Sequence, residues 1–345
     1  MQTDIKSMTT EELKDLMRSL GEKEFRAKQI YEWMHKKLAS DYEEMTNISA
    51  ALKEKLKNTC TYTKLQMLRM QESAEDGTRK YLFALPDGNT VETVFMRYKH
   101  GNSVCISSQV GCRMGCKFCA STLDGLERCL LPSEMLEQIY EVTRHTGERV
   151  SNIVVMGTGE PLDNYDNLVR FLRMISDENG LNISQRNITV STCGLVPKML
   201  ELAKEKLQIT LALSLHATTD EKRKEIMPIA NSYSISQLMD ACKVYFEETG
   251  RRITFEYALI AGVNDSIEQA AQLAELARPL HCHINLIPVN PVKERGYAES
   301  SKAAIVAFKN KLEKKQITVT IRREMGRDID GACGQLRRRY VCEKK

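Results

Sequence analysis

The chain has 345 residues, enough for one large domain and an accessory one, and its 42% hydrophobic content is enough for a sizeable core. Its 50 Lys and Arg against 46 Asp and Glu give a net charge of +4, which does not by itself indicate nucleic-acid binding. The first residues are polar and no apolar run approaches the ~20 residues that span a membrane, so we expect a cytoplasmic protein. In that compartment its eleven cysteines point to metal or catalytic use rather than to disulfides.

Residues 1–58 are predicted to form a helical accessory domain. Thr9 and Glu12 have the spacing of a helix start, apolar residues then recur at helical spacing, and Gly21 ends that helix. In a second helix, basic side chains stand among the aromatic residues of the stretch F-R-A-K-Q-I-Y-E-W-M. That pattern fits the solvated basic face of a small helical bundle, or a surface that contacts RNA.

Residues 59–102 are predicted to form a β-meander. Alternating runs are separated by the turn signals Asp76-Gly77 and Pro86-Asp87-Gly88-Asn89. Glu92 lies in an otherwise apolar strand, where it is either an outward-facing residue of an alternating strand or a residue with a separate role.

Residues 103–345 are predicted to form a parallel α/β core, because strands and helices alternate. The expected strands are Ser103–Gln109, Asn152–Met156, Asn187–Ser191, Ile209–Leu215, Ile253–Ile260 and Ile284–Val289. The expected helices lie near residues 132–146, 164–178, 197–205, 235–249, 266–279 and 301–315. Six such units fall short of a closed eightfold barrel. A last strand, Ile317–Arg322, leads into a loop, Gly326–Leu336.

Three cysteines in the loop after the first core strand have the spacing of a shared inorganic centre. Cys112, Cys116 and Cys119 read C-x-x-x-C-x-x-C, so their thiolates can converge. Three thiolates leave a tetrahedral zinc site one ligand short, but they suit a cubane iron–sulfur cluster in which one iron keeps an open position. A zinc loop completed by a distant Cys or His is the alternative.

Polar motifs follow the later core strands. Met156-Gly157-Thr158-Gly159-Glu160-Pro161 follows the second, and glycines there allow a ligand to approach the backbone while Glu160 accepts from an amino group. The other motifs contribute Ser191, Ser214 with Leu215 and His216, and Asn290. Each alone is an ordinary turn residue, whereas together at one face they indicate a ligand site.

Two features close the chain. Cys333 stands between small residues in Gly331-Ala332-Cys333-Gly334-Gln335-Leu336, which is not typical of a core position. Arg337, Arg338 and Arg339 form a basic run that either contacts phosphates or is a solvated tail.

The cysteine motif, with Phe118 before its last Cys, resembles the radical S-adenosylmethionine (SAM) superfamily. The spellings C-R-M-G-C-K-F-C-A-S-T and A-C-G-Q-L narrow the resemblance to the RlmN/Cfr group of RNA adenine methyltransferases, and to its RlmN branch. The resemblance covers about residues 5 to 340. It implies a partial (β/α)6 radical-SAM barrel with an N-terminal helical accessory domain that contacts RNA and a small β-extension.

The resemblance also implies the chemistry. Cys112, Cys116 and Cys119 would hold a [4Fe-4S] cluster, and SAM would bind at Gly159, Glu160, Ser191, Ser214, the Leu215 backbone, His216 and Asn290. One SAM would methylate Cys333, and a second would yield the radical that activates this methyl group for addition to adenine. Glu92 would take the proton from ring carbon 2 as general base. Cys105 would then attack the sulfur of Cys333, forming a disulfide and releasing the product.

The implied substrates are an adenosine in the peptidyl-transferase centre of 23S ribosomal RNA and an anticodon-adjacent adenosine in transfer RNA. The implied electron donor is a flavodoxin- or ferredoxin-like protein, and we expect a monomer. One rival is a Cfr-type enzyme that methylates carbon 8 of adenine and confers antibiotic resistance on the ribosome. The other is a zinc-stapled RNA-binding module without catalysis.

Overall fold

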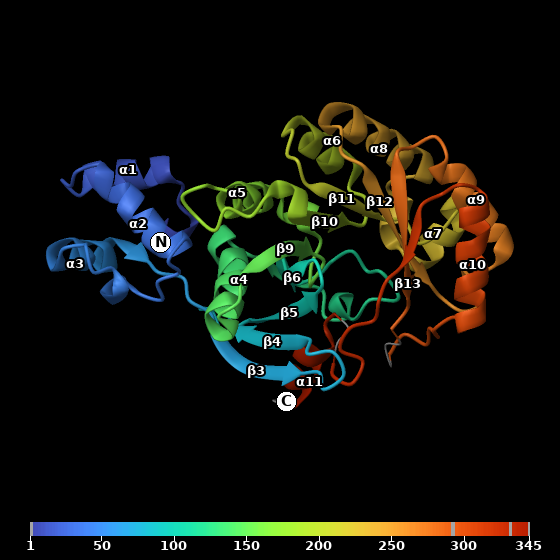
Figure 1. The fold of residues 1–345 in the computed structure, drawn as a ribbon, viewed down its shortest axis with the longest axis horizontal. Coiled ribbons are helices and arrows are strands. Elements are labelled where there is room, and N and C mark those ends of the chain that lie inside the picture. Colours follow the sequence, from blue (N-terminus) through green and yellow to red (C-terminus); the bar gives the residue numbers. More distant parts are fainter. Residues whose placement is uncertain (1–2, 291–293, 331–332, 344–345) are drawn as a thin grey trace.

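The protein is built around one ten-stranded mixed sheet (Figure 1). The computed structural model describes residues 3–290, 294–330 and 333–343. The strand order is β14-β13-β12-β11-β10-β9-β6-β5-β4-β3, so β14 and β3 are edges and the sheet does not close into a barrel. The ten strands are β3 Gln66–Glu72, β4 Arg79–Ala84, β5 Thr90–Tyr98, β6 Gly101–Cys105, β9 Val150–Val155, β10 Ile188–Thr192, β11 Thr210–Ser214, β12 Ile253–Leu259, β13 Cys282–Pro288 and β14 Val319–Ile321.

Seven of these strands, β6 and β9 to β14, run parallel to one another. Parallel strands need crossovers, and helices supply them on the outside of the curved sheet (Figure 1). These helices are α4 Pro132–Thr146, α5 Tyr165–Ile175, α6 Val196–Lys204, α7 Asp220–Ile226, α8 Ile235–Thr249, α9 Ile267–Ala277 and α10 Lys302–Lys314. The predicted partial α/β barrel is confirmed, and α7 is an element that the sequence analysis did not predict.

Local signals set the helix ends. Ser234 and Gln237 form a capping box at the start of α8, and Ser266 and Gln269 form one at the start of α9. The predicted first core strand differs from the structure, since β6 ends at Cys105 and a separate strand, β7 Gln109–Gly111, pairs with β8 Leu126–Cys129. The break carries the chain out of the sheet and into the cysteine loop.

The predicted β-meander is a direct extension of the core sheet. β3, β4 and β5 pair antiparallel, and β5 pairs antiparallel with β6. The predicted boundary at residue 103 falls inside β6, which spans Gly101–Cys105. The sheet thus runs without a break across the predicted boundary between residues 59–102 and 103–345. The division into residues 1–58, 59–102 and 103–345 stays a prediction.

The N-terminal residues form a helical lobe at one end of the molecule (Figure 1). It contains α1 Thr10–Ser19, α2 Phe25–His35 and α3 Ala50–Thr59, and the short strands β1 Thr3–Asp4 and β2 Cys60–Thr61 pair at its base. A buried ion pair of 2.6 Å joins Lys6 Nζ to Glu137 Oε1 on α4, and both side chains are almost fully buried. The lobe is thus fastened to the core by a polar contact that excludes water.

Short helical turns complete the described elements. They are the 3-10 helices η1 Ile5–Ser7, η2 Tyr42–Glu44, η3 Ala120–Thr122, η4 Pro161–Asn164, η5 Gln185–Asn187 and η6 Pro228–Asn231. Within the described ranges no helix is long and apolar enough to cross a membrane.

The C-terminal segment folds back onto the β3–β5 extension. The predicted loop Gly326–Leu336 is too long, because a last helix, α11 Gln335–Glu343, begins inside it and carries the three-arginine run. Arg338 pairs with Glu294 at 2.8 Å, and Arg339 pairs with Glu343 and Asp330. Arg337 Nε donates to the Thr90 carbonyl. The run is therefore helical and internally paired, not a solvated tail.

Candidate active site

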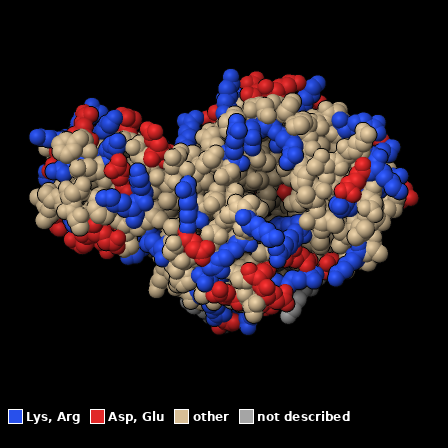
Figure 2. Space-filling view, in the orientation of Figure 1, with Lys and Arg blue, Asp and Glu red and all other residues tan. Residues whose placement is uncertain are grey.

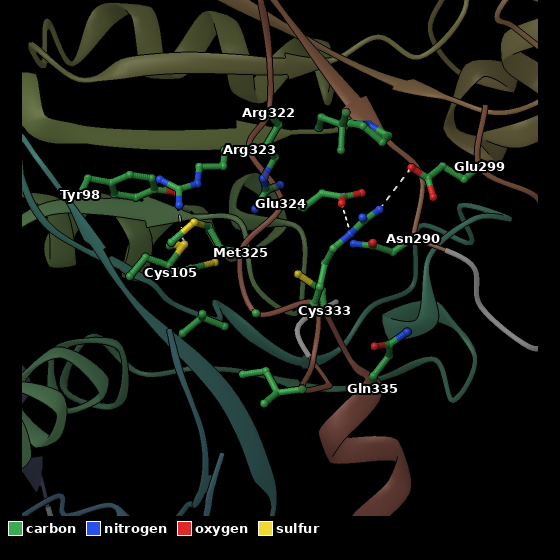
Figure 3. Close-up of a pocket in the computed structure, with 17 residues that line it drawn as sticks. Tyr98, Cys105, Asn290, Glu299, Arg322, Arg323, Glu324, Met325, Cys333 and Gln335 are labelled. Atoms are coloured by element: carbon green, nitrogen blue, oxygen red, sulfur yellow. Dashed lines mark hydrogen bonds and ion pairs between the residues drawn. The ribbon is translucent and has the colours of Figure 1, made fainter. Parts of the chain in front are cut away.

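Two adjoining cavities lie at the carboxyl ends of the parallel strands. The three-cysteine cavity has a volume of about 260 Å³ and is lined by Cys112, Cys116 and Cys119 together with the ends of β9 to β13. The two-thiol cavity has a volume of about 430 Å³ and is lined by Cys105 and Cys333 (Figure 3). The volume of the two-thiol cavity is within the range typical of small-molecule sites, and that of the three-cysteine cavity is slightly below it. Figure 2 shows a hollow near the middle of this face, with Lys and Arg side chains on its rim.

The cysteine loop runs from the end of β7 to η3. Cys112 and Cys116 are buried, Cys119 is half-buried, and Met227 and Ile226 pack behind Cys116. Among the described residues, no three His, Cys, Asp or Glu side chains lie close enough to hold a single metal ion. Ligands of a cubane bind different irons and therefore stand farther apart than ligands of one ion. Three thiols on one wall of a cavity fit such a cluster.

The G-E-P turn after β9 forms the floor of the three-cysteine cavity. Gly159 has φ 111°, and a Cβ there would lie 2.6 Å from the Cβ of Gln109, so only glycine fits. Glu160 is 3% exposed, and its oxygens accept from the backbone N–H groups of Leu162 at 3.0 Å and Cys193 at 2.7 Å. Burial raises the pKa of Glu160. A bound ammonium group would offset that cost, which fits the predicted role.

His216 presents a defined tautomer to the same cavity. Burial, with a smaller contribution from Arg223, lowers the pKa of His216 to about 3, so the ring is neutral. Its Nδ1 accepts from the backbone N–H of Ala258 at 2.9 Å, which leaves the proton on Nε2 as a donor. The residue has φ 57°, a strained conformation for a non-glycine residue that often marks a functional site.

The remaining predicted ligand residues divide into two groups. Ser191, Ser214 and Asn290 line the three-cysteine cavity, and the two hydroxyls lie 3.4 Å apart. Leu215 does not line it. Its carbonyl accepts from Arg223 Nε and from the Ala217 N–H, and its own N–H donates to the Glu256 carbonyl. The backbone of Leu215 is thus already hydrogen-bonded, and its predicted contact to a ligand stays a prediction.

The two candidate catalytic thiols share the two-thiol cavity. Cys105 ends β6, and Cys333 precedes α11, with its Sγ 3.4 Å from the Met156 carbonyl oxygen. Burial raises the pKa of Cys105 to about 12, with a further contribution from Cys333. Burial also raises the pKa of Cys333, while the charge of Lys80 lowers it. Cys333 lines both cavities, which makes it the thiol that they share.

Glu92 does not line either cavity. Its Oε2 accepts from the Gly334 N–H at 2.6 Å and lies 3.1 Å from Lys80 Nζ, and its Oε1 accepts from the Arg337 N–H at 2.7 Å. The carboxylate therefore caps the start of α11 one residue beyond Cys333. Its role as a general base stays a prediction, and the structure adds a contact that the sequence did not indicate.

Three charged residues near the thiols were not predicted as site residues from the sequence. Arg322 lines both cavities, Glu256 lines the three-cysteine cavity, and Lys80 is fully buried beside Glu92. Burial raises the pKa of Glu256 to about 7. A charged residue in an apolar strand was the available signal for Glu256 and Lys80, as it was for Glu92. Arg322 carried no local signal, because it stands in a basic stretch.

A parallel α/β sheet with this cysteine loop after its first strand and this glutamate turn after the second defines the radical SAM class of enzymes. Residues 106–274 match the description "Radical SAM superfamily". A solved radical SAM methyltransferase from Sphaerobacter thermophilus is 42% identical and superposes with a TM-score of 0.92, covering 96% of this chain and 98% of that one. The class brings SAM and a [4Fe-4S] cluster as its reagents.

Residues 3–61 match the "Ribosomal RNA large subunit methyltransferase N-terminal domain". The protein named "Probable dual-specificity RNA methyltransferase RlmN" in Lachnospira eligens is 66% identical over 98% of this chain and 97% of its own length. The protein of the same name in Clostridium perfringens strain 13 is 55% identical over 99% and 98%. The chain belongs to the RlmN family of radical SAM RNA methyltransferases, and the predicted resemblance is confirmed.

Proposed function

We propose that this enzyme methylates carbon 2 of two adenosines. One lies in the peptidyl-transferase centre of 23S ribosomal RNA, and the other is next to the anticodon of transfer RNA. The enzyme consumes two SAM molecules per methylation, because one methylates Cys333 and the second activates that methyl group. Adenine carbon 2 is electrophilic and does not attack a sulfonium as a nucleophile, so a carrier thiol and a radical route are needed. The words "dual-specificity RNA methyltransferase" in the names of the relatives support two RNA substrates, and the match of residues 3–61 supports large-subunit ribosomal RNA as one of them.

One observation carries the proposal: Cys333 lines both cavities. The three-cysteine cavity has the donors for a cluster and a SAM molecule, and the two-thiol cavity contains the second thiol, Cys105. A thiol that must receive a methyl group from one ligand and deliver it to another belongs at such a junction. This position therefore supports a carrier role for Cys333 over that of an incidental free thiol.

The residues fit a [4Fe-4S] cluster and SAM. Cys112, Cys116 and Cys119 would hold the cluster, Glu160 would bind the methionine amino group, and Ser191, Ser214, the Leu215 backbone, His216 and Asn290 would contact the rest of SAM. When bound, the cluster and SAM supply one electron and a species that abstracts hydrogen. The cavity excludes bulk water from these groups, since Cys116, Glu160 and His216 are all buried.

The chain's own residues perform the remaining steps. The target adenosine leaves its stack and enters the two-thiol cavity, where the carbon carried by Cys333 joins the ring. Glu92 takes the proton from carbon 2. Cys105 attacks the sulfur of Cys333, so the sulfur–sulfur bond of the Cys105–Cys333 disulfide forms as the sulfur–carbon bond breaks. The released carbon keeps the electron pair and takes up a proton, which completes the methyl group of the product. Burial keeps Cys105 protonated, so it does not react with other electrophiles before this step.

The test is to incubate the anaerobic holoenzyme with reductant, SAM and two RNAs, a 23S fragment and a transfer RNA. Mass spectrometry of the digested nucleosides locates the methyl group on the ring. We expect 2-methyladenosine from both RNAs, and none from the Cys333→Ala variant. A methyl group on carbon 8 would overturn the carbon 2 assignment, and methylation by Cys333→Ala would overturn the carrier.

The accessory properties belong to the same proposal. We propose that residues 1–58 contact RNA, that residues 59–102 and 103–345 form the extension and the catalytic core, and that the enzyme is a cytoplasmic monomer. A flavodoxin- or ferredoxin-like protein supplies the electron. An exposed basic side chain on the cysteine loop, Lys117, gives such an acidic donor a contact near the cluster ligands.

A further inference from the structure

Described residues on both sides of Cys333 are hydrogen-bonded to the β3–β5 extension. The Gly326 N–H donates to Asp76, Asp328 accepts from Ser73 and from the Ala74 N–H, and Asp330 exchanges two hydrogen bonds with Gln71. Beyond Cys333, Arg69 pairs with Glu343 at the exposed end of α11. The extension therefore fixes the position of the chain around Cys333. Of these contacts, the one between Gln71 and Asp330 is the nearest to Cys333 in sequence.

Lys80 contributes two further contacts to this part of the extension. Its side chain is fully buried, and its Nζ donates to the Asp330 carbonyl at 2.5 Å and lies 3.1 Å from Glu92 Oε2. A buried ammonium group is held only where it is paired with a charge and hydrogen-bonded, and both conditions are met here. Lys80 thus connects the residue three positions before Cys333 with the carboxylate that caps the helix after it.

Glu92 completes the connection from the other side. It accepts from the N–H groups of Gly334 and Arg337. N–H groups at the start of a helix have no acceptor within that helix, so the Glu92 carboxylate satisfies them. Gly334 has φ 81°, and a Cβ there would lie 3.2 Å from Ser121 N in η3, so the loop passes close to the cysteine loop at this point. The chain is therefore held by hydrogen bonds at Asp330, before Cys333, and at Gly334, directly after it.

We propose that Lys80 is a positioning residue for methyl transfer: by fastening Asp330 and Glu92 together it sets where Cys333 stands between the two cavities. This inference rests on the proposed function, because it concerns the thiol that carries the methyl group. Cys333 has to reach one ligand in the three-cysteine cavity and another in the two-thiol cavity. Hydrogen bonds at Asp330 and Gly334 fix the chain on both sides of Cys333 and so set the position of its thiol.

The test compares three variants of the full-length holoenzyme. Lys80→Met removes the cation but keeps the volume and the unbranched stem. Gln71→Leu removes the side-chain contact on the other side of Asp330. Arg69→Ala removes an exposed contact between the same two segments and serves as the matched control. For each, we would measure iron content, SAM affinity, the methylated fraction of Cys333 by peptide mass spectrometry, and kcat and KM for transfer of a labelled methyl group to RNA.

A misplaced thiol lowers the rate of transfer and leaves ligand binding alone, since a shift of about 1 Å costs about 100-fold. We therefore expect Lys80→Met to lower kcat about 100-fold with parental iron content and SAM affinity, Gln71→Leu to lower kcat by about tenfold, and Arg69→Ala to match the parent. A parental kcat in Lys80→Met overturns the proposal. So does a parallel loss of iron, SAM affinity and rate, because Lys80 would then only hold the fold together.

Gln71→Leu keeps the proposal open to refutation if Lys80→Met does not fold, because Gln71 is only half-buried. A parental kcat and a parental methylated fraction of Cys333 in Gln71→Leu would then overturn it. Failure of the proposed function would look different. In that case the parent enzyme itself would never acquire a methyl group on Cys333, whatever residue stands at position 80.

Discussion

Glu160 Oε2 accepts a hydrogen bond from the backbone N–H of Cys193 at 2.7 Å, which joins the turn after β9 to the turn after β10. This bond aims the glutamate into the three-cysteine cavity and fixes two adjacent strand ends relative to each other. The carboxylate is therefore held in place before any ligand arrives, so binding does not carry the entropic cost of ordering it.

Replacement of Glu160 by Gln should weaken SAM binding without loss of the cluster. The variant keeps the shape but removes the charge that pairs with the amino group, and hydrogen bonds to charged groups contribute about 1.5–3 kcal/mol. Equilibrium binding to the anaerobic holoenzyme should show SAM affinity about 10- to 100-fold lower. Glu201→Gln, a half-buried residue of α6 that pairs with Lys198, is the control. Unchanged affinity in Glu160→Gln would remove this residue from the ligand site.

Replacement of Cys112, Cys116 or Cys119 by Ala should abolish the cluster. Two remaining thiolates do not hold a cubane, so iron and sulfide should fall to background after anaerobic reconstitution. Cys242→Ala, which removes a buried thiol from the core cluster on α8, should retain full iron. Full iron and activity in any of the three ligand variants would contradict the assignment.

Replacement of Cys105 by Ala should trap the enzyme on its RNA. Cys333 still receives the methyl group and still attacks the ring, but no thiol then resolves the bond between protein and RNA. A band that survives denaturation and collapses on nuclease treatment should accumulate. Glu92→Ala should stall earlier, with the proton still on the ring. Free methyladenosine and no adduct from Cys105→Ala would defeat the proposed mechanism.

Release of the product should accelerate with rising pH. Burial raises the pKa of Cys105 to about 12, and only the thiolate attacks the sulfur of Cys333. Well below that pKa, the thiolate fraction rises about tenfold for each pH unit. Rapid-quench measurement of adduct decay in a single turnover should therefore show a rate that climbs between about pH 7 and pH 9. A flat profile over that range would mean that another step limits release.

Arg322 and Arg323 should contribute to RNA binding more than the arginine run of α11. Both line the two-thiol cavity, and among the described residues neither guanidinium has a carboxylate partner (Figure 3). Arg338 and Arg339 are paired with Glu294 and Glu343. Removing one phosphate-binding side chain reduces the slope of log affinity against log salt by about 1. Neutralising the cavity pair should flatten the slope, and neutralising the helical pair should change it little; the reverse result would restore the helix as the RNA-binding surface.

Motif spacing and the alternation of strands and helices were readable from the sequence. The cysteine loop, the G-E-P turn and the polar residues after β10, β11 and β13 were each predicted at a strand end, and parallel strands bring such ends to one edge of a sheet. Most element bounds were correct to within a few residues, because local caps such as Ser234 and Gly250 set them. The family assignment depended on these local patterns, and so it needed no three-dimensional information.

The tertiary structure decided what the spacing could not. Glu92 and Lys80 are separated from Cys333 by more than two hundred residues, so no periodicity links them, and only the return of α11 onto the extension brings them into contact. The basic run that was predicted as a tail lies in this helix, and its arginines pair with acidic side chains. Local sequence determines which residues end a strand and start a helix, whereas the partners of a buried charge depend on which distant segment covers it and excludes water.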